Sequence, residues 1–133
     1  MKTDPIILTF DPKFKGEMAS PTGQIALGNQ ENGMKPYHLL YGALGSCFYA
    51  TFLGVVDKMR LTFDEIKLEI TGNKREVVPT MLDHVVMRFT VVNPSHEEKM
   101  KKAAHLGAEY CSIHETIKKV AQIDLIVEFD YRT

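Results

Sequence analysis

Two cysteines, Cys47 and Cys111, are the residues of this 133-residue sequence whose chemistry stands out. A thiolate is both a nucleophile and a metal ligand, and its population depends on the local pKa. Cys111 directly precedes Ser112 and Glu115, which form the capping-box pattern of a helix start. Free backbone N–H groups and the helix dipole stabilise a thiolate at such a position. We therefore expect Cys111 to ionise readily.

Cys47 lies in the middle of a predicted helix, where no dipole stabilises a thiolate. It would need a cation from another element in order to ionise. Free cysteine is also among the most buried residue types, so composition and spacing alone favour two structural thiols. No secretion signal is visible in the opening residues MKTDPIILTF, and a reducing cytoplasm is the expected location. In that compartment a permanent disulfide is not expected, and catalytic or redox roles stay open for both cysteines.

A metal site has little support in the sequence. The five histidines are scattered, and neither an HExxH nor a CxxC motif is present. The nearest pair, Cys111 and His114, could supply three ligands together with Cys47. The sequence also lacks a Gly-rich phosphate loop, because the glycines of Gly42-Ala43-Leu44-Gly45 lie within an apolar helix. We expect no metal and no cofactor.

The segment from Pro36 to about Met59 must position Cys47. It has helical length and is apolar nearly all the way round, which is typical of a helix that is buried on every side. Small residues form one row on it, as in helices that pack closely against another backbone: Gly42, Ser46, Ala50 and Gly54. About 24 residues span roughly 36 Å, which is long for a chain of this size. We infer that one subunit alone does not cover this helix. A membrane span is the competing interpretation, but polar residues and three glycines within the segment argue against it.

The rest of the chain predicts an α+β fold in the order βββ-α-ββ-αα-β. Alternating apolar residues predict strands over residues 6–10, 17–20, 24–27, 63–71, 84–92 and 123–131. Two capping boxes predict the second and third helices: Ser95 with Glu98, for a helix to about Tyr110, and Ser112 with Glu115, for a helix to about Val120. Strands that come in runs indicate α+β rather than a wound parallel sheet. We expect one domain over residues 1–133.

Composition excludes some partners. The formal net charge of −1 argues against nucleic-acid binding, which requires a basic surface. The lysines between Lys99 and Lys102 follow two glutamates on a predicted helix, so they indicate a solvated face. We expect neither a nucleic-acid nor a membrane partner.

Two motifs resemble those of the OsmC/Ohr family. The central helix is similar to its pattern, roughly P-x-x-L-L-x-A-L-G-x-C, with one more residue between Leu40 and Ala43. The matching residues are Pro36, Leu39, Leu40, Ala43, Leu44, Gly45 and Cys47. The second family motif is a cysteine that opens a short helix, roughly C-P-[IV]-[SH]-x-T-[IL]. Its matching residues are Cys111, Ile113, His114, Thr116 and Ile117, with Ser112 where proline is usual. The order of elements agrees as well, so the resemblance covers nearly the whole chain.

The resemblance implies an intertwined homodimer with two long central helices, and a peroxidase that reduces organic hydroperoxides in oxidative-stress defence. By position, Cys47 would be the peroxidatic cysteine and Cys111 the resolving one. The peroxide would oxidise Cys47 to a sulfenic acid, which would condense with Cys111 to a disulfide. A dithiol, such as a lipoylated protein, would then reduce that disulfide. Leu44, Phe48 and Tyr110 would form an apolar wall that favours bulky organic peroxides.

The sequence departs from the family where Cys47 would be activated. The family has a glutamate ten residues before the first cysteine, and this chain has Tyr37 there. The family arginine is missing too, because Arg60 is the first arginine, and the cations available between the first strand and the helix are Lys13, Lys15 and Lys35. Tyr37, Lys15 and His114 are therefore the candidate assisting residues. The alternative is a weak or inactive family member that binds a small lipophilic ligand in the dimer cleft.

Overall fold

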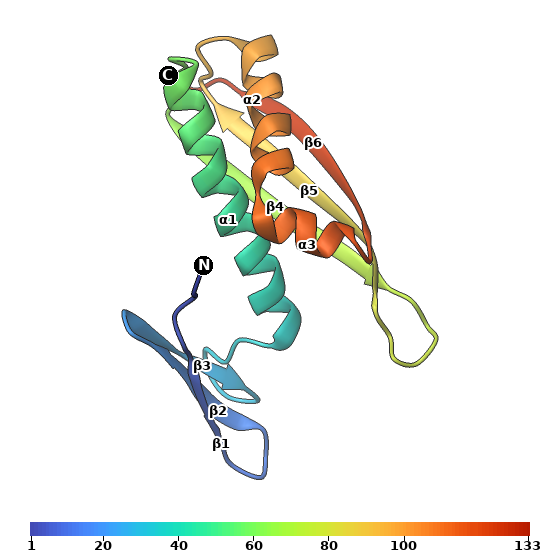
Figure 1. The fold of residues 1–133 in the computed structure, drawn as a ribbon. Helices are drawn as coiled ribbons and strands as arrows, with labels where there is room; N and C mark the ends of the chain where they lie inside the picture. The colour runs from blue at the N-terminus through green and yellow to red at the C-terminus, as the bar shows by residue number, and fades with distance from the viewer. The chain divides into compact units, whose positions relative to one another are not determined.

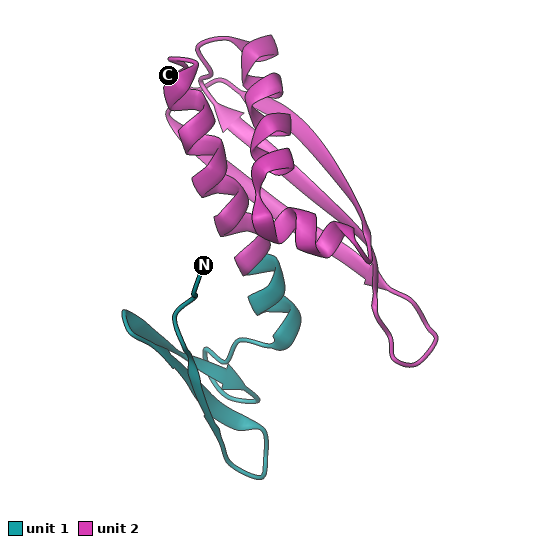
Figure 2. Cartoon of the chain, in the orientation of Figure 1, with its two compact units in different colours: residues 1–42 teal, residues 43–133 magenta.

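The elements follow one another in the predicted order, βββ-α-ββ-αα-β, and the α+β class is confirmed. The computed structural model describes residues 1–133 (Figure 1). They form two units, residues 1–42 and residues 43–133 (Figure 2). The expectation of one domain over the whole chain stays a prediction.

The first unit contains a three-stranded antiparallel sheet in the order β1-β2-β3. Its strands are β1 (Ile7–Phe10), β2 (Lys15–Ser20) and β3 (Gly23–Gly28). Asp11 begins the first turn, where its Oδ1 accepts the N–H groups of Lys13 and Lys15 at 2.9 Å each. One side of this unit has an apolar hollow of about 340 Å³, lined by Leu8, Phe10, Phe14, Leu27, Met34, Pro36 and Leu39. Several of these side chains are exposed, so this unit does not cover its own apolar surface.

The second unit is built on a sheet in the order β4-β5-β6. Its strands are β4 (Glu65–Lys74), β5 (Leu82–Val92) and β6 (Gln122–Asp130); β5 pairs antiparallel with β4 and parallel with β6. The apolar residues of β5 alternate as the sequence predicts. Four of them are fully buried: Val85, Met87, Phe89 and Val91. The central strand therefore carries the core of this unit.

The helices are α1 (Pro36–Lys58), α2 (Glu97–Tyr110) and α3 (Ser112–Lys118). Within the second unit, α1 and α2 cover one face of the sheet (Figure 1). Phe48 and Phe52 of α1 pack edge-on against Phe89 of β5, with ring centroids 4.9 and 4.8 Å apart. The two helices come close at Gly107, where an added Cβ would lie 3.1 Å from the Cα of Phe52. This packing fixes the middle of α1, which carries Cys47, against the end of α2.

Within this chain, α1 is buried on one side only, and burial on every side stays a prediction. Its buried residues all lie on the face toward the sheet: Leu44, Gly45, Phe48, Phe52 and Val56. The small residues Ser46, Ala50 and Gly54 are exposed, because the sheet of the second unit packs against the other side of the helix. The helix also has the length and the mean hydropathy, 1.7, of a membrane span, but core helices share these properties.

The two predicted helix caps are each shifted by one residue. His96 rather than Ser95 caps α2, with its Nδ1 accepting the N–H of Lys99 at 3.2 Å. Ser95 Oγ accepts the N–H of Thr62 instead. Cys111 rather than Ser112 caps α3, with its Sγ accepting the N–H of His114 at 3.4 Å. The side chain of Ser112 is therefore not engaged in capping.

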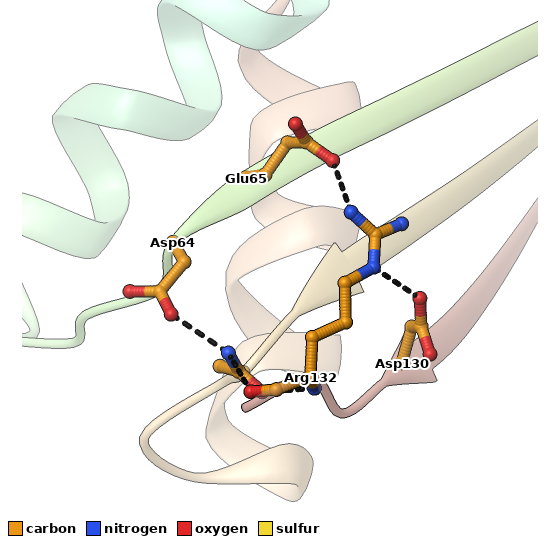
Figure 3. Close-up of polar contacts among 5 residues, drawn as sticks. Asp64, Glu65, Asp130 and Arg132 are labelled. Atoms are coloured by element: carbon orange, nitrogen blue, oxygen red, sulfur yellow. Dashed lines mark hydrogen bonds and ion pairs between the residues drawn. The ribbon is translucent and has the colours of Figure 1, made fainter.

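A polar network closes the end of the second sheet (Figure 3). Arg132 Nη1 lies 2.8 Å from Glu65 Oε2, and Arg132 Nε lies 2.9 Å from Asp130 Oδ2. Asn93 ends β5 with a positive φ of 51° and bonds both the backbone of Arg132 and Asp64 Oδ2. Exposed ion pairs contribute little singly, so the register of the three strands rests mainly on their ladders and on the core.

Candidate active site

The fold brings the two cysteines together although 63 residues separate them in the sequence. Cys47 lies in the middle of α1, and Cys111 lies at the junction where α2 ends and α3 begins. Cys111 is fully buried, Cys47 is half-buried, and both thiols are free. The two side chains are within hydrogen-bond reach of each other. A disulfide between them requires that the two Cα atoms come within roughly 7 Å.

The pKa of Cys47 lies below its ordinary value. Burial raises this pKa, but hydrogen bonds outweigh that effect: the backbone N–H of Ile113, the Cys111 thiol, and the hydroxyl and N–H of Ser112. The Ser112 Oγ lies 3.9 Å from the Cys47 Sγ. The first turn of α3 thus points its free N–H groups at the sulfur of another helix, where they stabilise a thiolate.

The pKa of Cys111 is raised to about 11. Burial is the main cause, and the negative charge and hydrogen bond of Cys47 act in the same direction. The N–H groups of His114 and Ile113 lower the pKa only in part. At neutral pH, Cys111 therefore keeps its proton and donates it toward the Cys47 sulfur.

These acidities correct the sequence-based expectation. Cys111 was expected to be the readily ionised thiol because it precedes a helix start, yet its burial raises its pKa. Cys47 was expected to require a cation, yet neutral donors lower its pKa. Sequence reasoning missed Ser112 and the N–H of Ile113 as functional groups. A helix start next to one cysteine signals available N–H groups, but it does not identify the sulfur that they face.

The three candidate assisting residues lie in different places. His114 is buried, its Nδ1 lies 2.8 Å from Glu115 Oε2, and its backbone N–H donates to the Cys111 sulfur. Its side chain lines a polar hollow formed with α2 and β6, so its assisting role would act through Cys111. Lys15 begins β2, and Tyr37 packs edge-on against Tyr41. Both belong to residues 1–42, and their roles stay predictions.

The predicted apolar wall is corrected in two of its three residues. Leu44 and Phe48 have no exposed surface, because the helix packs them into the core against the sheet. Tyr110 is 67% exposed. It lines an open, mainly apolar hollow of about 550 Å³ between α1 and α2, together with Thr51, Gly54, Val55, Lys58, Met59 and Leu106.

The structure holds no group of three or more His, Cys, Asp or Glu side chains arranged to bind a metal ion. The sequence suggested Cys47, Cys111 and His114 as a possible set of three metal ligands. Its histidine is engaged by Glu115 instead. The site brings together two free thiols.

Comparison with known proteins gives a consistent result for the fold. A family model described as OsmC-like protein matches residues 28–126. Protein YhfA of Escherichia coli K12 is 26% identical over 113 residues, which cover 83% of this chain and 84% of YhfA.

Solved structures resemble the chain over nearly its whole length. A hypothetical protein from Aquifex aeolicus has a TM-score of 0.89 at 22% identity and covers 100% of both chains. An OsmC-like protein from Mycoplasma pneumoniae has a TM-score of 0.85 at 19% identity, over 96% of this chain and 97% of its own. An organic hydroperoxide resistance protein from Legionella pneumophila has a TM-score of 0.76 at 11% identity, over 96% and 98%. At these identities the likeness concerns the fold.

Proposed function

Because this chain belongs to the OsmC-like protein family, we propose that it is a thiol-dependent peroxidase that reduces organic hydroperoxides. The observation that carries the proposal is the pair of free thiols in contact, one with a lowered pKa and the other with a raised pKa. A peroxidase of this kind requires one thiolate as nucleophile and a second thiol within reach. The organic hydroperoxide resistance proteins among the structural neighbours support the choice of substrate.

In the first step, the Cys47 thiolate attacks the outer oxygen of the hydroperoxide. The S–O bond forms as the O–O bond breaks, so the sulfur loses two electrons and the peroxide gains them. The alkoxide takes a proton from solvent and leaves as an alcohol, and Cys47 becomes a sulfenic acid. The lowered pKa of Cys47 increases the fraction of thiolate, which is the form that this step needs.

In the second step, Cys111 attacks the Cys47 sulfenic acid, the disulfide forms and water leaves. Once Cys47 has lost its negative charge, it no longer raises the pKa of Cys111, while the N–H of His114 still lowers it. Oxidation of the first thiol therefore promotes deprotonation of the second. An external dithiol, such as a lipoylated protein, returns both cysteines to the thiol state by two-electron exchange.

The proposal includes a homodimer in the cytoplasm, with a role in oxidative-stress defence. The exposed row Ser46, Ala50 and Gly54 on α1 supports a second copy as partner, because small residues permit close helix packing.

The test is to add one equivalent of cumene hydroperoxide to the reduced protein and to map its peptides by mass spectrometry. We expect a Cys47–Cys111 disulfide within one chain and the loss of two hydrogens from the intact mass. The variant Cys111→Ser should instead accumulate a Cys47 sulfenic acid that dimedone traps. The proposal fails if both thiols remain free in the unmodified protein.

A second candidate function is binding of a small lipophilic ligand without chemistry. The hollow beside Tyr110 favours it, because its volume of about 550 Å³ and mainly apolar lining suit such a ligand. In that case small molecules should copurify with the protein, and Cys47→Ser should leave their affinity unchanged. A large loss of affinity in Cys47→Ser would count against this second function.

A further inference from the structure

Ser112 has an unusual position between the two cysteines and their helices. It is the first residue of α3, and its Oγ lies 3.9 Å from the Cys47 sulfur. Its carbonyl oxygen accepts a hydrogen bond from Thr116 Oγ1 at 2.8 Å on the helix side. Cys111, not Ser112, caps α3, so the Ser112 hydroxyl is not used to start the helix. Both donor groups of Ser112 are therefore available to Cys47.

We propose that Ser112 is a catalytic residue, whose hydroxyl and backbone N–H both donate to the Cys47 sulfur and hold it as a thiolate without a cation. This inference rests on the peroxidase function proposed above and names the group that activates its nucleophile. A thiolate has no proton, so the hydroxyl must be the donor in this contact. Hydrogen bonds to an ionised acceptor are roughly twice as strong as neutral ones.

Within residues 43–133, the groups that lower the pKa of Cys47 are neutral donors. The titratable side chain that faces Cys47 is Cys111, and it keeps its proton because its pKa is about 11. The remaining donors are the backbone N–H groups of Ile113 and of Ser112 itself. The lowered pKa of Cys47 thus arises from hydrogen bonds that overcome burial.

The hydroxyl can also serve after the first oxidation. A hydroxyl is both donor and acceptor, and it rotates to suit its partner. When the thiolate becomes a sulfenic acid, the same Ser112 oxygen can accept the new S–O–H proton. A fixed cation could not make this exchange, because it has no acceptor.

Three substitutions of Ser112 distinguish the effect of its hydroxyl from that of its backbone N–H. Ser112→Ala removes the hydroxyl and keeps the N–H, while Ser112→Thr keeps both. Ser112→Pro removes both, and the local backbone is suited to it. Proline is favoured at the first helical position, and Cys111 has φ −79° and ψ 116°, the extended conformation preferred before proline.

The measurement is the pH profile of Cys47 alkylation by iodoacetamide in the reduced full chain, followed on the Cys47 peptide by mass spectrometry. We expect the midpoint to rise by about one pH unit in Ser112→Ala, a tenfold fall in the acid dissociation constant. Ser112→Pro should raise it further, and Ser112→Thr should restore the original value.

An unchanged midpoint in Ser112→Ala would overturn the role of the hydroxyl, whether or not Ser112→Pro folds. This readout needs no peroxide, so it is separate from the test of peroxidase function. If Ser112→Ala shifts the midpoint while the unmodified protein forms no disulfide with cumene hydroperoxide, Ser112 acidifies Cys47 and the peroxidase function alone fails.

Discussion

At the scale of single residues, the two thiols differ in pKa because they hold different positions relative to the first turn of α3. The first turn of α3 donates N–H groups to Cys47, which approaches from α1 and stays half-buried. Cys111 belongs to that turn itself and is fully buried. When Cys47 is ionised, its negative charge raises the pKa of Cys111 further. The order of the proposed reaction follows from this asymmetry. Cys47, the more acidic thiol, reacts with the peroxide, and Cys111, which is protonated, then forms the disulfide with the Cys47 sulfenic acid.

The mutual influence of the thiols predicts the behaviour of Cys47→Ser. Burial would still raise the pKa of Cys111, but the charge and hydrogen bond of Cys47 would no longer add to it. The pKa of Cys111 should therefore fall below about 11. Its alkylation speeds up as the pH rises in both proteins, and the profile of the variant should lie at lower pH. Peptide mass spectrometry between pH 8 and 12 measures this; an unmoved profile would show that Cys47 has no effect on Cys111.

The sequence identified both cysteines but not which of them is acidic. The residue types and motifs marked Cys47 and Cys111 as the candidates. Acidity depends on how deeply each sulfur is buried and on which of them receives the donors of Ser112, and the contact between Ser112 and Cys47 joins segments 65 residues apart. No local pattern encodes it. The burial of Leu44 and Phe48 escaped prediction for a similar reason, since an apolar helix does not reveal which of its faces meets the sheet.

At the scale of elements, patterns with a strong period were predicted well. Alternation identified β5 and its buried face, and apolar length identified α1 within one residue of its end. Caps were predicted less well, because neighbouring residues compete for the same N–H group. Ser95 and His96 can both cap α2, and Ser95 is instead bonded to Thr62 across the loop. Cys111 caps α3 through a sulfur, which a hydroxyl-based pattern does not anticipate.

The crossing of α1 and α2 predicts the effect of Gly107→Ala. An added Cβ would lie 3.1 Å from Phe52 Cα and 3.3 Å from Phe52 N, and the backbone of a packed helix cannot easily move. Overpacking typically costs about 1–3 kcal/mol, against a gain of roughly 0.5–1 kcal/mol in helix propensity. We expect a net loss of about 1 kcal/mol in the free energy of unfolding, measured by urea denaturation.

The matched control for this crossing is Lys102→Ala, an exposed position on the same helix. It should change the free energy of unfolding by no more than about 0.5 kcal/mol. A variant Gly107→Ala that is as stable as the unmodified protein would show that the two helices can separate at Phe52 without cost. The disulfide test on that variant would then report whether Cys47 and Cys111 stay in reach.

At the scale of the whole molecule, each of the two units leaves an apolar surface uncovered. In the first unit it is the hollow that Leu8, Phe10 and Phe14 help to line. In the second unit it is the outer face of α1, where Leu53 is 40% exposed, beside the hollow at Tyr110. Monomeric soluble proteins rarely leave extended apolar patches in water. The homodimer proposed above would bury such surfaces.

This predicts that Leu53→Lys weakens self-association. The unmodified chain, at 15.1 kDa, should elute as a dimer by size-exclusion chromatography with light scattering. A lysine at position 53 would place a charge on the outer face of α1 and would have to be desolvated in the dimer, which is costly without a partner. The matched control is Thr71→Lys, which adds the same charge at an exposed position of β4. We expect a concentration-dependent shift toward monomer in Leu53→Lys alone. If the unmodified chain is a monomer at all concentrations, or both variants remain dimers, the outer face of α1 does not form the contact between subunits.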